Sequence, residues 1–66
     1  MPTVLIALPP ALAEHMATYF AREGMTTVVH GRDTFAVEAI DYVASFRPPP
    51  GLLATLPNLK AMLSLG

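Results

Sequence analysis

Residues 3–29, TVLIALPPALAEHMATYFAREGMTTVV, decide the fold of this chain. Two short apolar runs rich in β-branched residues, 3–8 and 26–29, flank a segment with a different periodicity. Continuous apolar runs of this length are typical of strands that are buried on both faces of a parallel sheet. A helix between two such strands makes a βαβ unit, whose crossover is right-handed in almost every known case.

The segment between the two runs predicts a helix over residues 11–23. Proline is favourable at the first position of a helix, where Pro10 stands, and Gly24 occupies the place of a C-terminal capping glycine. Apolar side chains recur at i, i+4, i+7 and i+8 and predict one buried stripe: Leu12, Met16, Tyr19 and Phe20.

The second half of the chain continues the alternation of strands and helices. Residues 42–46 (YVASF) predict a third strand, which the three prolines at 48–50 must end because proline donates no backbone hydrogen bond. Leu52, Leu53 and Leu56 predict a short helix that starts at Pro50 and stops at Pro57. Residues 60–65 predict a fourth strand, and Gly66 is expected to begin a turn.

Residues 32–41 (RDTFAVEAID) are ambiguous. Asp33 could cap a short helix, or the segment could be an irregular connection. In either case the order of elements predicts an α/β fold: a flavodoxin-like open parallel sheet of four strands in the order 2-1-3-4, with helices on both faces. Ligands of such sheets bind outside the carboxyl ends of the strands, beside the first and third strands, where the winding reverses.

Composition limits the classes of function. The 66 residues form at most one domain, and 53% hydrophobic against 14% charged residues is apolar for so short a chain. The net charge is −1 without any basic cluster, which argues against nucleic acid as a partner. No run is long enough to cross a membrane, and the N-terminus lacks the basic region of a signal peptide. We therefore expect a cytoplasmic protein, and the absence of cysteine suits a reducing compartment.

Few side chains at the expected site carry chemistry. Arg47 is the one cation placed there, either as a solvated charge or as a ligand for a carboxylate or phosphate group. Phe46 belongs either to the core or to an apolar wall of the site. His15 and His30 have no acidic, nucleophilic or metal-spaced partner in the sequence, so both are expected to be surface residues. We therefore assign no catalytic residue and no metal ligand.

Residues 41–66, DYVASFRPPPGLLATLPNLKAMLSLG, resemble the N-terminal region of the D-isomer-specific 2-hydroxyacid dehydrogenases, and most of all the glyoxylate/hydroxypyruvate reductase branch. The resemblance rests on a strand that ends in an aromatic and a basic residue before prolines, on LPNLKA at 56–61, and on SLG at 64–66. Residues 1–40 agree with that family only in their βαβ layout. Relatives commonly carry tryptophan where this chain has Phe46.

The resemblance implies that residues 1–66 are the N-terminal part of the substrate (catalytic) domain of an NAD(P)-dependent oxidoreductase. The parent enzyme, a homodimer, would reduce small 2-oxo acids such as glyoxylate or hydroxypyruvate to 2-hydroxy acids. Phe46, Arg47 and Gly66 would be substrate-binding residues, with Gly66 starting the loop that holds the substrate carboxylate. The NAD- or NADP-binding domain and the catalytic residues would lie outside this chain, which alone is expected to be inert and to bind no cofactor.

A second hypothesis, from another class, is a stand-alone α/β binding or interaction module. An apolar short chain with an uncovered strand needs a partner, and such a module would oligomerise through the open edge of the sheet or bind a small anion near Arg47.

Overall fold

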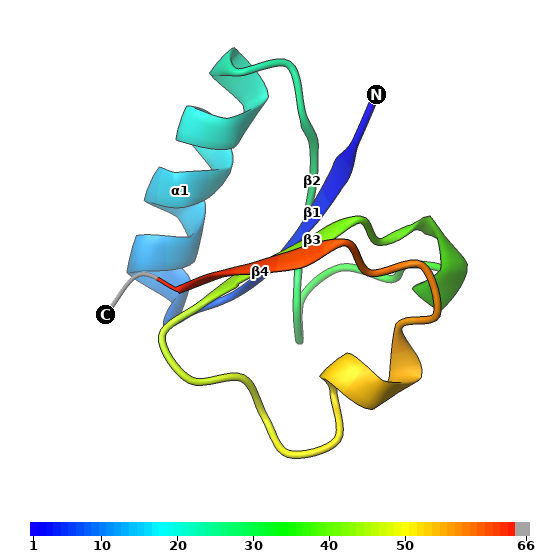
Figure 1. Cartoon of the computed structure of the whole chain (residues 1–66). Helices are drawn as coiled ribbons and strands as arrows, with labels where there is room; N and C mark the ends of the chain where they lie inside the picture. Colours follow the sequence, from blue (N-terminus) through cyan, green and yellow to red (C-terminus); the bar gives the residue numbers. More distant parts are fainter. Residues whose placement is uncertain (65–66) are drawn as a thin grey trace.

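The computed structural model describes residues 1–64 and confirms the open parallel sheet (Figure 1). Its strands are β1 (Thr3–Ala7), β2 (Thr26–Val29), β3 (Tyr42–Ser45) and β4 (Ala61–Ser64). All neighbouring strands are parallel, in the order β2-β1-β3-β4. The first and third strands each end one residue earlier than predicted, and the expected turn at Gly66 lies outside the described residues.

The helix α1 (Pro10–Arg22) covers one face of the sheet, but with a different stripe from the predicted one. Its inward positions are Ala13, Met16, Ala17 and Phe20, which follow an i, i+3, i+4, i+7 spacing. Tyr19 is 52% exposed, so its assignment to the buried stripe was wrong. The small alanines allow α1 to lie close to the sheet, whereas the Tyr19 ring stays at the side and meets Phe20 edge-on, 5.4 Å between centroids.

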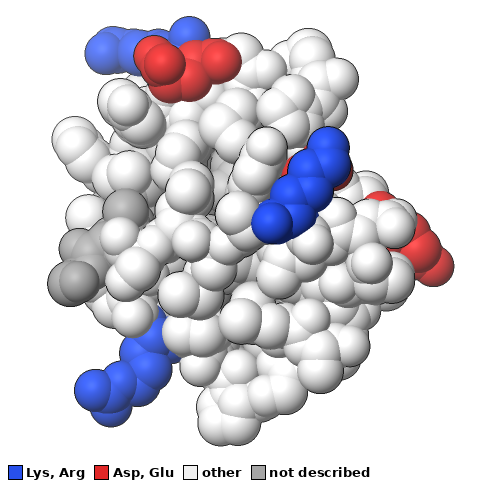
Figure 2. Space-filling model, in the orientation of Figure 1, with Lys and Arg blue, Asp and Glu red and all other residues white. Residues whose placement is uncertain are grey.

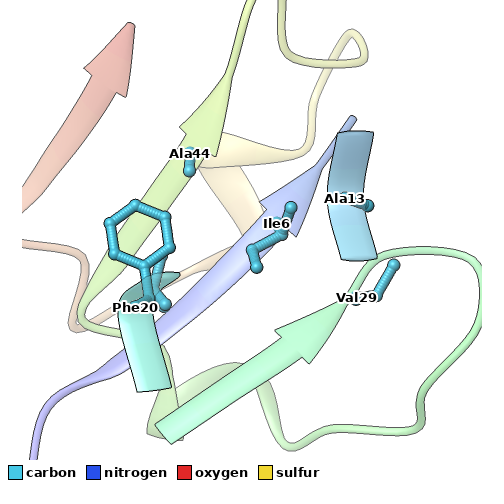
Figure 3. Close-up of a cluster of buried hydrophobic side chains, with 6 residues drawn as sticks. Ile6, Ala13, Phe20, Val29 and Ala44 are labelled. Atoms are coloured by element: carbon cyan, nitrogen blue, oxygen red, sulfur yellow. The ribbon is translucent and has the colours of Figure 1, made fainter. Parts of the chain in front are cut away.

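Side chains alternate between two apolar layers, one on each face of the sheet. The layer under α1 joins Phe20 to Ile6, Val29 and Ala44 from three strands (Figure 3). The register explains this grouping because Ile6 pairs with both Val29 and Ala44. The neighbouring row, centred on Leu5, points to the other face and builds the second layer: Leu5, Ile40, Val43 and Leu56.

The second face is covered by the connection before β3, through Phe35 and Ile40, and by the leucine segment, and not by an α-helix. Each of these segments contains one short 3-10 helix, η1 (Val37–Ala39) and η2 (Leu53–Thr55), and the rest of residues 32–41 is irregular. The leucine segment forms turns and one 3-10 turn because prolines precede and follow it closely and Gly51 has a φ of +79°. Leu52 and Leu53 still pack against the second layer, as their spacing predicted.

Asp41 ties the strands together at their amino ends. Its carboxylate accepts a hydrogen bond from the Thr3 backbone N–H at 2.9 Å, and its Oδ1 lies 3.7 Å from the Lys60 ammonium. Its backbone N–H donates to the Thr3 carbonyl at 3.0 Å, and its carbonyl accepts from the Lys60 N–H at 2.7 Å. One residue therefore fixes the starts of β1, β3 and β4. In the described part of the chain, no helix has the length and apolar character needed to cross a bilayer.

Candidate functional site

The strand order places the candidate site at the carboxyl ends of β1 and β3. The chain leaves β1 toward α1 on one face of the sheet and leaves β3 toward η2 on the other, as Figure 1 shows. Two neighbouring parallel strands whose connections diverge in this way leave an open crevice between their carboxyl ends. The strand order of the structure therefore places the candidate site at the carboxyl ends of β1 and β3, the edge that the sequence predicted.

A hollow of about 310 Å³ lies at this edge and is open to solvent. Its volume is at the low end of the range for small-molecule sites. The segment after β1, the end of β2 and the segment after β3 all contribute to its lining: residues 7–9, His30, Phe46, Arg47 and Pro49. The structure thus brings Phe46 and Arg47 together in one hollow.

Phe46 belongs to the wall of this hollow and not to the core. The residue is 46% exposed, so the interpretation of Phe46 as a core residue was wrong. The preceding residue explains the change of environment: Ser45 is fully buried, and its hydroxyl donates to the Ala7 carbonyl at 3.0 Å. This bond ties the ends of β1 and β3, and the chain emerges from the sheet at the next residue.

Arg47 contributes an exposed guanidinium to the hollow. Residues 1–64 contain two ion pairs, Arg32 with Asp33 and Lys60 with Asp41, and Arg47 takes part in neither. Its position fits both sequence interpretations, a solvated charge and an anion ligand. Gly66, the third predicted substrate-binding residue, lies outside the described residues.

His30 was not among the predicted site residues, although it lines the hollow. It follows β2 at a turn in which the Arg32 N–H donates to the Val29 carbonyl at 3.1 Å. Gly31 has a φ of +84°, as the third residue of a type II turn requires. The signal that could have found His30 is the strand order: β2 and β3 both flank β1, so their following residues reach the same edge. The expectation of a surface position is correct, since His30 is exposed.

A second hollow, of about 370 Å³, adjoins the first and shares Leu8 and His30 with it. Its charged lining residues are Glu14 and Arg32. Arg32 donates from Nε and Nη2 to the Asp33 carboxylate, both at 3.1 Å. This side-chain hydrogen bond lowers the pKa of Asp33, and a second bond from the Val29 backbone N–H, at 2.8 Å, lowers it further. The charge of Arg32 is thus already compensated.

The distribution of charge on one face of the described chain gives no support to a polyanionic partner. Figure 2 shows the basic side chains of one face well separated, with no basic patch on that face. His15 is exposed on α1 and, in the described chain, belongs to neither hollow. Residues 1–64 contain no group of three His, Cys, Asp or Glu side chains arranged to hold a metal ion.

The turn after β1 differs from the turns that bind dinucleotide cofactors. Dinucleotide sites use a glycine-rich turn after a strand, because the backbone must approach the pyrophosphate and donate N–H groups to it. The turn after β1 is Leu8-Pro9-Pro10, where two prolines offer no N–H and no glycine is present. Comparisons with protein-family models, with curated proteins and with solved structures gave no match for this chain. The family resemblance of residues 41–66 therefore stays a prediction.

Proposed function

We propose that this chain is the N-terminal part of the substrate domain of an oxidoreductase that reduces small 2-oxo acids with NADH or NADPH. The observation that carries the proposal is the hollow at the β1/β3 switch point, lined by Phe46 and Arg47. The segment that builds its β3 side is also the one whose sequence resembles the 2-hydroxyacid dehydrogenases. Sequence and topology, which are independent arguments, thus favour the same edge of the sheet.

The proposed role of this chain is to bind and orient the substrate. A guanidinium offers several N–H donors in a planar fork that matches a carboxylate, so Arg47 is suited to a 2-oxo acid. Phe46 would exclude water from one side of the hollow. The hydride donor and the proton-transferring residues would be supplied by the rest of the parent enzyme, a proposal supported by the two prolines in the turn after β1.

The test is an assay of NADH and NADPH oxidation in the presence of glyoxylate or hydroxypyruvate. It is carried out on the 66-residue chain and on the complete product of the gene that encodes it. We expect activity only in a gene product that continues beyond Gly66. Activity of the short chain would refute its role as an inert segment, and an inactive, folded full-length product would refute the reductase function.

A matched pair of variants links the hollow to the reaction. In the active gene product, Arg47→Gln should raise the KM for glyoxylate more than it lowers kcat, since it removes a contact that the bound substrate already makes. Arg22→Gln removes another exposed guanidinium, from the last turn of α1, and should change neither constant. Equal effects of the two substitutions would contradict a role for Arg47 in binding.

One observation favours the alternative, a module that assembles through the edge of its sheet. The edge strand β4 contains no charged residue and no proline, the features that usually protect an edge from pairing. Sedimentation velocity of the 66-residue chain would reveal a dimer. Ala61 is exposed on β4, so Ala61→Lys should dissociate this dimer. A monomeric wild-type chain would refute this alternative.

A further inference from the structure

The two adjoining hollows at the carboxyl edge differ in their charge. The one beside Glu14 contains a carboxylate that repels anions, and its Arg32 is already bound to Asp33. The one beside Phe46 is lined by Arg47 and His30, without any acidic side chain among its described lining residues. An anion that approaches this edge therefore meets a favourable field in one hollow and an opposed one in its neighbour.

We propose that His30 and Arg47 together form a binding site for a small organic carboxylate, in which His30 is a second ligand of the anion. This inference concerns the same hollow as the proposed reductase function, but it depends on no cofactor and on no reaction. It would hold equally if the chain acted as a stand-alone binding module.

The strand order supplies the geometry of the site. β2 and β3 lie on either side of β1, so their carboxyl ends are about 10 Å apart, two interstrand spacings. His30 follows the end of β2 directly, and Arg47 is the second residue after the end of β3. Residues 7–9, at the end of β1 and after it, line the same hollow. The volume of the hollow leaves room for one small anion. Arg47 offers a fork of N–H donors, and an imidazole offers at least one N–H donor in either protonation state.

The other lining residues select the kind of anion. The hollow of about 310 Å³ accommodates a ligand of a few heavy atoms. Phe46 and Pro49 give it an apolar side, which an organic acid can contact with its carbon atoms and an inorganic ion cannot. We therefore expect a short carboxylic acid to bind more tightly than phosphate.

The experiment is a titration of the ¹⁵N-labelled 66-residue chain with glycolate, followed by the amide resonances at constant ionic strength. Because both donors are exposed, we expect a dissociation constant on the order of 1 mM. Shifted amides should cluster in residues 7–8, 30–31 and 46–47. Shifts centred on Arg32 and Glu14, or no saturable shift at all, would overturn the proposal.

Three variants and one further anion complete the test. Arg47→Gln and His30→Phe should each weaken glycolate binding about three- to fivefold, in line with exposed charged contacts. Arg22→Gln should leave it unchanged, and the amide spectrum of each variant verifies its fold. If His30→Phe bound glycolate as tightly as the wild type does, His30 would not be a ligand of the anion. If phosphate bound as tightly as glycolate, the assignment of the site to a carboxylate would be overturned. The titration does not measure reductase activity. An absence of glycolate binding would therefore not refute the proposed reductase function, and an inactive gene product in the reductase assay would not refute the carboxylate site.

Discussion

Removal of the Asp41 carboxylate should destabilise the chain by about 2 kcal/mol. The main contribution is the hydrogen bond from the Thr3 N–H, at 2.9 Å, to a side chain that is 23% exposed. A hydrogen bond to a charged group contributes about 1.5–3 kcal/mol, and the partial exposure places this one toward the lower end. The pair with Lys60 adds at most about 0.5 kcal/mol, since the Lys60 side chain is 64% exposed and its ammonium lies 3.7 Å from the carboxylate.

The measurement is urea unfolding followed by circular dichroism, on Asp41→Ala, Asp41→Asn and Lys60→Gln. Asp41→Asn retains an oxygen acceptor for Thr3 without the charge, so it should cost about 1 kcal/mol. Lys60→Gln breaks the ion pair alone and should cost less than about 0.5 kcal/mol. For a domain of this size, Asp41→Ala should lower the melting temperature by roughly 10 °C.

Two outcomes would refute this reasoning about Asp41. If Lys60→Gln destabilised the chain as much as Asp41→Ala, the ion pair and not the hydrogen bond to Thr3 would be the stabilising contact. If Asp41→Ala lay within about 0.5 kcal/mol of the wild type, the backbone bonds of residue 41 would be sufficient to fix the strand starts. Glu38→Gln, a change of an exposed carboxylate nearby in sequence, serves as the control for a general effect of charge.

Three further predictions concern other contacts. The pKa of Asp33 is lowered in the folded state, so its ionised carboxylate should stabilise the fold above about pH 4. This stabilisation should be lost as the pH falls through the folded-state pKa. Urea-unfolding midpoints measured against pH should show the loss in the wild type and not in Asp33→Asn. Phe20→Ala should cost about 3–4 kcal/mol and Tyr19→Ala less than about 1 kcal/mol in urea unfolding, since the first side chain is buried and the second half exposed. Ser45→Ala should cost about 1 kcal/mol by the same measurement, because the Ala7 carbonyl loses its buried hydroxyl donor.

The strands and their order were predictable because each depends on a local pattern. Short β-branched runs identified β1 and β2, and the prolines after Arg47 fixed the end of β3 to within one residue. The stripe of α1 was predicted with less success. A stripe containing Tyr19 and a stripe containing Ala13 and Ala17 are both compatible with helical periodicity, and the large side chains favoured the first. Close approach of α1 to the sheet, a property of the packed fold, selects the second.

The candidate site shows the same division between topology and side-chain placement. The edge that carries it follows from strand order alone, because parallel strands bring their carboxyl ends together. The environment of Phe46 does not follow from the order, since it depends on whether β3 ends at residue 45 or 46. Ser45 decides this by binding the Ala7 carbonyl, a contact that joins residues 38 positions apart.

His30 illustrates why some residues of such a site cannot be predicted from their neighbours in sequence. In sequence it stands between a strand and a glycine, with no chemical partner nearby, and that isolation argued for a plain surface histidine. Its partner, Arg47, is distant in sequence and becomes a neighbour only because β1 lies between β2 and β3. In a parallel sheet with this order, the residues after the two strands that flank the first one should therefore be considered as a pair. For this chain that pair is one cation and one imidazole that line a single hollow, a combination suited to an anion.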